Sequence, residues 1–376
     1  MRRYLAFFAV LFSVFVIGYL EPVFFPSEKA EVTVNQNGRQ NVSHTALPHE
    51  ELPASGFSLY IGKNSTDFVK EFGEPLTKYD TGLGYELWTF GEEDSEYMEL
   101  SVSNGKIAAV KAFNDTENTA PFDMGMNLSD ISELTTIYSN FDIEYNQETF
   151  SIELMEEDMN YRPMIAFDND TFAILFFTHG KDVLSGVVYL SKEYLLTVMP
   201  YQLAYGQSLA IPIGETSAES IDEKQKTMTR TINFLRIKEE LPAYAINPAV
   251  ERNAEYLYAS YEEYIADILT VERLEALSQV KSESLGAISS SFAFTKKEYE
   301  TMIAKSSLTI QKPAGAFMTP VYDPSFTALF WFSDGAYYLR FASDKNEDIG
   351  IAFSKEDVLV LLQTIEKNTD ETEESG

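Results

Sequence analysis

The stretch YIGKNSTDFVKEFGEP (60–75) is partly repeated by DMGMNLSDISEL (123–134) further along the chain. The shared positions are Gly62, Asn64 and Asp67 in the first stretch and Gly125, Asn127 and Asp130 in the second. The glycine permits a turn, the asparagine suits a helix N-cap, and an aspartate in the first turn interacts favourably with the helix dipole. We therefore interpret these six residues as turn and helix-cap positions, and a repeated polar binding site is the less favoured alternative.

The residues around each stretch predict a strand, a helix and then an antiparallel meander. Residues 57–61 alternate between apolar and polar as in a short strand, and the helix that follows can end at Gly73. Asn104-Gly105 between two apolar runs is a hairpin signal. Strands of the second unit are expected at 149–155, 164–167, 171–177 and 185–191. The pattern predicts an α+β domain with an internal repeat over 56–206.

This order of elements resembles the N-terminal region that accompanies CAP domains in Gram-positive bacteria. CAP denotes the fold of cysteine-rich secretory proteins, antigen 5 and pathogenesis-related proteins. The resemblance covers about 57–205 and rests on the glycine turn, the FGEP exit (72–75), the strand in GLGYELWTF (82–90) and the second MGMNLSDI (124–131). It implies a protein of the Gram-positive cell envelope.

The segment 223–264 is similar to the opening of a CAP domain. That opening carries an Asn-x-x-Arg pair in a first helix, a leucine after it and an alanine in the next helix. The matching residues are Asn233, Arg236, Leu241 and Ala254. Apolar residues at helical spacing support two helices here, separated by Pro242 and Pro248. The resemblance therefore implies a helix-rich, CAP-like α+β domain over 207–367.

The resemblance fails at the position of the CAP site. Active-looking CAP domains hold two histidines and two acidic residues around a central cavity. This chain has three histidines, His44, His49 and His179, and none lies after residue 206. No nucleophile motif or P-loop is present, and the acidic run 344–348 lacks the glycine of a calcium loop. We therefore expect a degenerate CAP-like domain with no catalytic residue, no metal ligand and no cofactor.

A second interpretation of the C-terminal part makes it a further copy of the preceding domain. Residues 326–363 parallel 172–200, because both read as strand, turn, strand, Ser-Lys-Glu and an apolar helix. The Ser-Lys-Glu triplets stand at 191–193 and 354–356, and the serine suits a helix cap in both.

The start of the chain predicts a membrane anchor. Arg2 and Arg3 precede an uncharged run from Tyr4 to Leu20, which is long enough for a short membrane span with its N-terminus in the cytoplasm. Secretion after signal-peptide cleavage is the alternative. Residues 1–25 are thus expected to be a single-pass signal-anchor, 26–55 a flexible tether and 368–376 an acidic tail.

Composition narrows the class of function. The 376 residues carry a formal net charge of −31, which argues against nucleic-acid binding, and the lack of cysteine excludes disulfides. One helix offers a possible interaction surface, although packing into a core is the preferred interpretation. Its tyrosines are Tyr256, Tyr258, Tyr261 and Tyr264.

These observations favour a membrane-anchored extracytoplasmic binding or scaffolding protein, and not an enzyme. Its expected partners are the membrane, through the N-terminal helix, and an envelope protein or wall glycan. The alternatives are a binder of a small ligand, lipid or wall glycan in a residual CAP-like cavity, and a carboxylate-dependent hydrolase.

Overall fold

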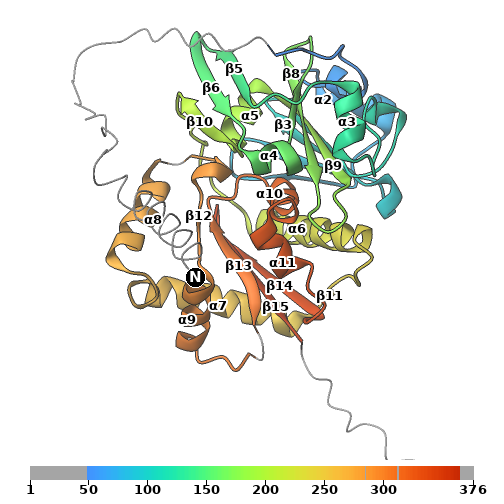
Figure 1. The fold of residues 1–376 in the computed structure, drawn as a ribbon. Coiled ribbons are helices and arrows are strands. Elements are labelled where there is room, and N and C mark those ends of the chain that lie inside the picture. Colours follow the sequence, from blue (N-terminus) through green and yellow to red (C-terminus); the bar gives the residue numbers. More distant parts are fainter. Residues whose placement is uncertain (1–48, 284, 311–312, 365–376) are drawn as a thin grey trace, which may run out of the picture. The chain divides into compact units, whose positions relative to one another are not determined.

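The computed structural model describes residues 49–283, 285–310 and 313–364, which belong to the compact unit that starts at Ala46 (Figure 1). The expected anchor (1–25), most of the expected tether and the acidic tail lie outside the described residues. In the part of the chain that the structure describes, no helix is both long enough and apolar enough to cross a membrane.

The N-terminal domain is built on a seven-stranded antiparallel sheet with the order β1-β2-β3-β4-β9-β8-β7. Its strands are β1 (Thr77–Asp80), β2 (Glu86–Phe90), β3 (Met98–Ser103), β4 (Lys106–Ala112), β7 (Met164–Ala166), β8 (Thr171–Phe177) and β9 (Leu184–Ser191). The turn between β3 and β4 is the expected hairpin, since Asn104 and Gly105 have φ of 51° and 74°. The predicted meander over 82–113 is therefore confirmed as β2–β4, and β1 extends it by a strand that was not predicted.

Short helices and a second sheet complete this domain. The helices are α2 (Ser65–Phe72), α3 (Leu128–Leu134), α4 (Glu156–Tyr161) and α5 (Lys192–Val198), with 3-10 turns η1 (Gly56–Leu59), η2 (Asp94–Glu96) and η3 (Glu117–Thr119). The three-stranded sheet has the order β10-β6-β5, from β5 (Asn140–Tyr145), β6 (Glu148–Glu153) and β10 (Gln202–Tyr205). Since the second unit divides its strands between two sheets, the internal repeat stays a prediction.

The C-terminal domain is a mixed five-stranded sheet between helices (Figure 1). Its strands run β11 (Ala245–Ile246), β14 (Asp348–Phe353), β15 (Val358–Gln363), β13 (Ala314–Thr319) and β12 (Phe292–Ala293), and only β11–β14 is parallel among these pairs. The helices are α6 (Ala218–Lys238), α7 (Pro248–Ile268), α8 (Val271–Glu283), α9 (Lys296–Lys305), α10 (Pro324–Phe332) and α11 (Gly335–Phe341), with the turn η4 (Ile288–Ser290).

Alternation along the central strand β15 explains this layering. Val358, Val360 and Leu362 pack into the core shared with α6 and α10, whereas Leu359 and Leu361 pack on the opposite face with α7 and α9. Successive side chains of a strand point to opposite faces, so a continuous apolar run fills both sides of the sheet. The first of these cores continues into the N-terminal domain, which packs one face of its large sheet against α6 and α10.

Two local predictions are wrong, and a third differs from the structure only at its last residues. The expected strand at 57–61 is instead the 3-10 turn η1, where the Ser58 hydroxyl accepts from the Ser55 N–H at 2.9 Å and donates to the Ser55 carbonyl at 2.7 Å. The expected tether is ordered in its last part, because Leu52 forms a parallel bridge with Phe167 and the Ala54 N–H donates to Asp168 Oδ1 at 2.8 Å.

The predicted likeness between 326–363 and 172–200 is also wrong. Residues 172–177 lie in strand β8, but 326–332 lie in helix α10, which Asp323 caps and Pro324 begins. Ser191 caps α5 as expected, whereas Ser354 lies in the turn between two strands and its N–H donates to the Asp357 carbonyl. The C-terminal domain is therefore no copy of the one before it.

Candidate functional site

The six repeated residues act locally in the two turn–helix segments. Asn127 and Asp130 form the predicted capping box of α3: Asn127 Oδ1 accepts from the Ser129 and Asp130 N–H groups, and Asp130 Oδ2 accepts from the Asn127 N–H. Asn64 occupies the same position before α2, but its side chain makes no capping bond, and Asp67 pairs with Lys70 at 2.7 Å. The glycines have the positive φ that the turns require, 79° at Gly62 and 88° at Gly125.

The residues that match the CAP opening hold the C-terminal domain together. The Asn233 amide donates to the Tyr244 carbonyl at 2.9 Å and accepts from the Tyr244 N–H at 2.8 Å. Arg236 is 1% exposed; its guanidinium lies 3.7 Å from the Tyr244 ring centroid and donates to the carbonyls of Pro242, Phe341 and Ser343. Further along, Ala254 is fully buried and Leu241 is half-buried.

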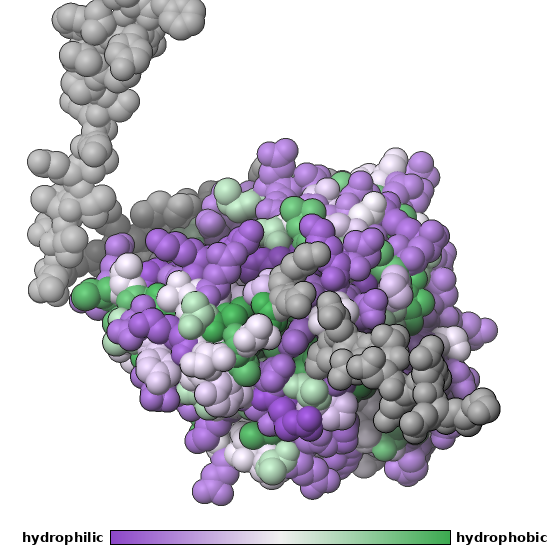
Figure 2. Space-filling model, turned by 90° about the horizontal axis from the view of Figure 1, so that it is seen from below, coloured by the Kyte–Doolittle hydropathy of each residue, from purple (hydrophilic) through white to green (hydrophobic). Residues whose placement is uncertain are grey.

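The tyrosines of α7 do not form one surface. Tyr261 is 2% exposed and packs against Phe294 and Phe317, so its assignment to an interaction surface is wrong. Tyr258 is half-buried and donates to Asp357, Tyr264 is half-buried at a helix kink, and Tyr256 remains exposed. On the described part of the face seen from below, hydrophobic residues form small groups among hydrophilic ones (Figure 2).

His179 of the N-terminal domain lies against the C-terminal domain, which has no histidine in its own sequence. The His179 N–H donates to the Phe332 carbonyl at 3.3 Å, and its ring stacks on Tyr161 with centroids 3.6 Å apart. Its Nε2 lies 3.6 Å from Glu157 Oε1. Among the described residues no three histidine, cysteine or acidic side chains are placed to hold a metal ion.

A buried charge cluster, which was not predicted from the sequence, joins the two domains. Lys111 of β4 donates to Glu99 of β3 at 2.9 Å and to Asp323 at the start of α10, and the side chains of Lys111 and Glu99 are fully buried. Tyr97 and Ser325 donate to Glu99, and Tyr194 donates to Asp323. Every charge in this cluster has its partners within the protein, so we interpret the cluster as the connection between the domains.

Burial and charge pairing shift the pKa values of Asp323 and Lys111 in opposite directions. Burial acts to raise the pKa of Asp323, but the Lys111 ammonium and its hydrogen bond outweigh it and hold that pKa below 3.8. Burial acts to lower the pKa of Lys111, and the two carboxylates outweigh it and raise that pKa above 10.5. Both groups therefore stay charged at neutral pH.

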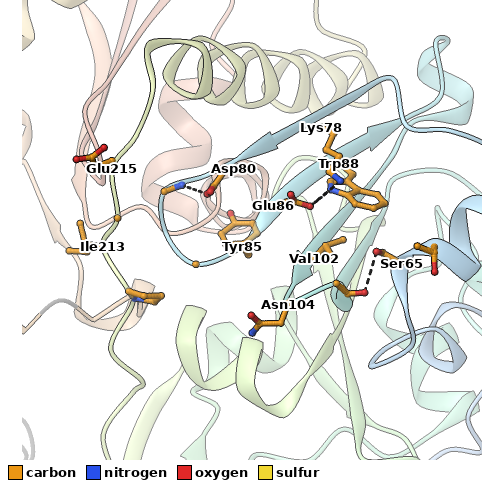
Figure 3. A pocket seen from close by; sticks show the side chains of 16 residues that line it. Ser65, Lys78, Asp80, Tyr85, Glu86, Trp88, Val102, Asn104, Ile213 and Glu215 are labelled. Atoms are coloured by element: carbon orange, nitrogen blue, oxygen red, sulfur yellow. Dashed lines mark hydrogen bonds and ion pairs between the residues drawn. The ribbon is translucent and has the colours of Figure 1, made fainter.

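An open groove lies in the N-terminal domain, with a volume of about 680 Å³ (Figure 3). It runs across β1, β2 and the β3–β4 turn, and the linker between β10 and α6 closes one side. Residues with side-chain polar groups or rings in its lining include Lys78, Asp80, Glu86, Trp88, Asn104 and Glu215. We call this site the groove.

Glycines allow the linker to approach the β1–β2 turn closely enough to form the wall. Gly82 and Gly84 have φ of 72° and 85°, and a Cβ at either would lie 2.3 Å from a linker atom of Thr216 or Pro212. The Gly214 N–H also donates to the Gly82 carbonyl at 2.7 Å. The GLG sequence at 82–84 thus has a packing role in this wall.

The chemistry of the groove is set by one indole and several carboxylates. The Trp88 Nε1–H donates to Glu86 Oε2 at 3.0 Å, and the Lys78 ammonium lies 4.3 Å from the Trp88 ring centroid and 3.4 Å from Glu86. Asp80 accepts from the Gly82 N–H at 2.8 Å and keeps an exposed side chain. Behind it, burial lowers the pKa of Lys224 to about 8, and the charge of Asp80 acts in the opposite direction.

The chain resembles known proteins over both domains. Residues 61–201 match the model of the family described as CAP-associated N-terminal. These residues are a CAP-associated N-terminal domain. A relative, the membrane protein YlbC of Bacillus subtilis (strain 168), is 24% identical over 194 residues, or 50% of this chain and 56% of YlbC, so the chain spans about half the length of that relative.

Two solved structures share the fold beyond the CAP-associated domain. A cysteine-rich secretory protein from Staphylococcus aureus subsp. aureus Mu50 has a TM-score of 0.64 at 18% identity, over 84% of this chain and 95% of that one. An extracellular protein containing a SCP domain from Bacillus anthracis str. Ames has a TM-score of 0.62 at 16% identity, over 86% and 100%. At these identities the likeness is one of fold, and it confirms the predicted CAP-like architecture after the CAP-associated domain.

Proposed function

We propose that this protein is an extracytoplasmic binding protein of the Gram-positive cell envelope, and that the groove of its CAP-associated domain binds glycan. The observation that carries the proposal is the composition of the groove, which combines a largely buried indole ring, three exposed or half-buried carboxylates and an exposed amide in one open site. The envelope setting is supported by the likeness to a membrane protein and to an extracellular protein, and by the apolar run that follows Arg2 and Arg3.

Polyhydroxylated ligands suit this set of side chains. Carboxylates accept hydrogen bonds from hydroxyl groups, and an amide such as that of Asn104 both donates and accepts. Three carboxylates (Asp80, Glu86 and Glu215) face one lysine in the lining, and the whole chain is strongly acidic, so anionic ligands are disfavoured. We therefore expect a neutral or amine-bearing glycan.

The ring of Trp88 is covered by Lys78, and this gives the proposal a spectroscopic readout. The chain has two tryptophans: Trp88 is 6% exposed where it lines the groove, and Trp331 is fully buried. A sugar that takes the place of the Lys78 ammonium on the ring changes the surroundings of Trp88 and leaves those of Trp331 unchanged. Its binding should therefore change tryptophan fluorescence saturably.

The test titrates the purified full chain with soluble, uncharged fragments of wall glycan and follows this fluorescence. Trp88→Phe should remove the fluorescence change, and Glu86→Gln should weaken binding about tenfold, as expected for the loss of hydrogen bonds to a charged group. Glu133→Gln, an exposed carboxylate on α3 outside the groove, is the matched control. Equal affinities for Glu86→Gln and Glu133→Gln would contradict the proposal.

The same samples distinguish binding from hydrolysis. Glycan fragments recovered unchanged after incubation support a binding protein. Cleavage that is abolished by Asp80→Asn or Glu86→Gln would instead establish the carboxylate-dependent hydrolase.

A further inference from the structure

A second pocket, of about 490 Å³, lies in the C-terminal domain and belongs neither to the groove nor to the buried charge cluster. It is formed by the first turn of α9, the start of β13, the end of α11 and the residues that follow α11. Four of its residues, Lys296, Arg340, Lys345 and Asn346, define what we call the basic pocket.

The charges of the basic pocket oppose those of the protein. The chain has 59 acidic and 28 basic side chains, yet Glu300 is the one acidic residue among those that line this pocket. Glu300 lies 3.9 Å from Lys296, and both side chains are well exposed, so this pair is weak. In the part of the chain that the structure describes, Arg340 and Lys345 have no carboxylate within ion-pair distance.

The helix dipole accounts for the position of only one of these cations. Arg340 lies in the last turn of α11, where a positive charge interacts favourably with the helix dipole. Lys296 lies in the first turn of α9, where a positive charge is unfavourable, and Lys345 lies beyond the end of α11. Lys296 and Lys345 therefore need another reason to stand beside Arg340.

Asn346 supplies an independent observation. Its side chain is 5% exposed and lines the basic pocket, but it makes no hydrogen bond with any residue that the structure describes. Its amide atoms reach the solvent of the cavity, where they are available to bond to an atom of a ligand. An amide N–H group next to three cations points to an acceptor that carries negative charge.

The phenol of Tyr299, in the wall of the basic pocket, carries no charge that would repel an anion. Tyr299 is 4% exposed, and its hydroxyl donates to the Val360 carbonyl at 2.6 Å. Burial raises its pKa far above 10.0, so the phenol stays neutral.

We propose that the basic pocket binds a phosphate-bearing ligand, with Arg340 as the bidentate donor, Lys296 and Lys345 as flanking charges and Asn346 as an additional donor. Guanidinium groups match the geometry of phosphate oxygens, and lysines add charge without fixed geometry. The phosphate can come from a free ion, from a glycerol-phosphate unit of an envelope polymer or from the headgroup of an anionic lipid.

The experiment measures binding of three probes to the purified full chain. Inorganic phosphate and glycerol 3-phosphate are titrated by calorimetry, and co-sedimentation is measured with phosphatidylglycerol and phosphatidylcholine vesicles. We expect Arg340→Gln to weaken binding of at least one phosphate probe about tenfold or more, the size expected for charge-assisted hydrogen bonds. The probe that binds most tightly identifies the source of the phosphate.

Lys297→Gln is the matched control, because it also removes one positive charge. Lys297 is an exposed neighbour of Lys296 on α9 and does not line the pocket. Vesicle binding is compared between variants, so any contribution of the N-terminal segment is the same in each. Equal losses in Lys297→Gln and Arg340→Gln, or no binding of any probe, would overturn the proposal. Trp88→Phe should leave phosphate binding unchanged, so the groove and the basic pocket can fail independently.

Discussion

The buried charge cluster and the basic pocket both concentrate cations, but they treat them in opposite ways. In the cluster, Lys111 is fully buried and faces two carboxylates. In the basic pocket, Arg340 and Lys345 border an open cavity, and no carboxylate of the described chain pairs with them. The first arrangement satisfies its charges within the protein, and the second leaves them available to a ligand.

This difference distinguishes residues that stabilise the fold from residues that can bind a ligand. The distinction matters here because the family resemblance does not identify a binding site. A buried ion pair is costly to form and strongly destabilising to break, so its residues are expected to affect folding. An open, unmatched cation contributes little to folding, so its effect should be on binding. Stability measurements on variants of the full chain test this distinction.

The largest effect is expected for Lys111→Met. Removing the ammonium leaves Glu99 and Asp323 buried with no cation beside them, which should lower the free energy of unfolding by about 3–5 kcal/mol. Chemical denaturation measures this loss. Lys111→Met combined with Asp323→Asn should recover part of it, because one uncompensated charge is removed.

Lys70→Met is the control for this prediction. Lys70 also pairs with an aspartate at 2.7 Å, but on the exposed surface, so the unfolding transition should stay close to that of the wild type. Similar losses for the two lysine variants would remove the distinction between the buried cluster and the surface.

Arg236 provides an intermediate case, because it is buried like Lys111 but donates its hydrogen bonds to backbone carbonyls. Arg236→Met should lower the free energy of unfolding by about 2–4 kcal/mol, since it leaves these carbonyls without their donor. Equilibrium denaturation compares it with Arg252→Met, an exposed arginine on α7. A wild-type midpoint for Arg236→Met would show that the CAP-like Asn-x-x-Arg pair is not a structural element.

The regular parts of this fold were predictable because their signals are local. Alternating or continuous apolar runs placed β8 and β9, and Asn104-Gly105 placed the turn between β3 and β4. The apolar run 324–332 was ambiguous between strand and helix, although Asp323-Pro324 carries the cap and first-turn signal of a helix. That signal could have corrected the false likeness to 172–200.

The candidate sites could not be predicted in the same way, because they depend on contacts between distant parts of the chain. Lys111 and Asp323 are 212 positions apart, and nothing local to either indicates the other. The groove needs the linker to lie against the β1–β2 turn, and the basic pocket needs α9 beside α11. A lysine in the apolar strand KIAAVKAF (106–113) was the one available hint of the cluster.

The tyrosines around the cluster predict a loss of stability at high pH. Burial, followed by the charge of Asp323, raises the pKa of Tyr194 well above 10.0. The unfolded tyrosine ionises near pH 10 while the folded one keeps its proton, so above pH 10 the unfolded chain binds fewer protons and stability falls. Tyr194 should contribute up to about 1.4 kcal/mol per pH unit to this fall.

Denaturation between pH 7 and 11 checks this contribution. Tyr194→Phe should be less stable at pH 7, because Asp323 loses a donor, but its stability should fall less steeply above pH 10. Tyr256→Phe, at an exposed position, should keep the wild-type slope. Parallel curves for wild type and Tyr194→Phe would contradict the assignment of the slope to the cluster.

The smallest effect is expected for Arg340→Gln, and it sharpens the comparison most. If Arg340 serves a ligand, its removal should change the free energy of unfolding by no more than about 0.5 kcal/mol, as for substitutions away from buried networks. Adding Lys345→Gln should not destabilise further, since the double variant removes like charges that border one cavity.

Denaturation without phosphate gives the intrinsic effect of each substitution. Repeating it with phosphate should stabilise the wild type alone, because a ligand of the folded state raises its stability. A loss comparable to that of Lys111→Met would instead make Arg340 a structural residue and remove the basic pocket from consideration as a binding site.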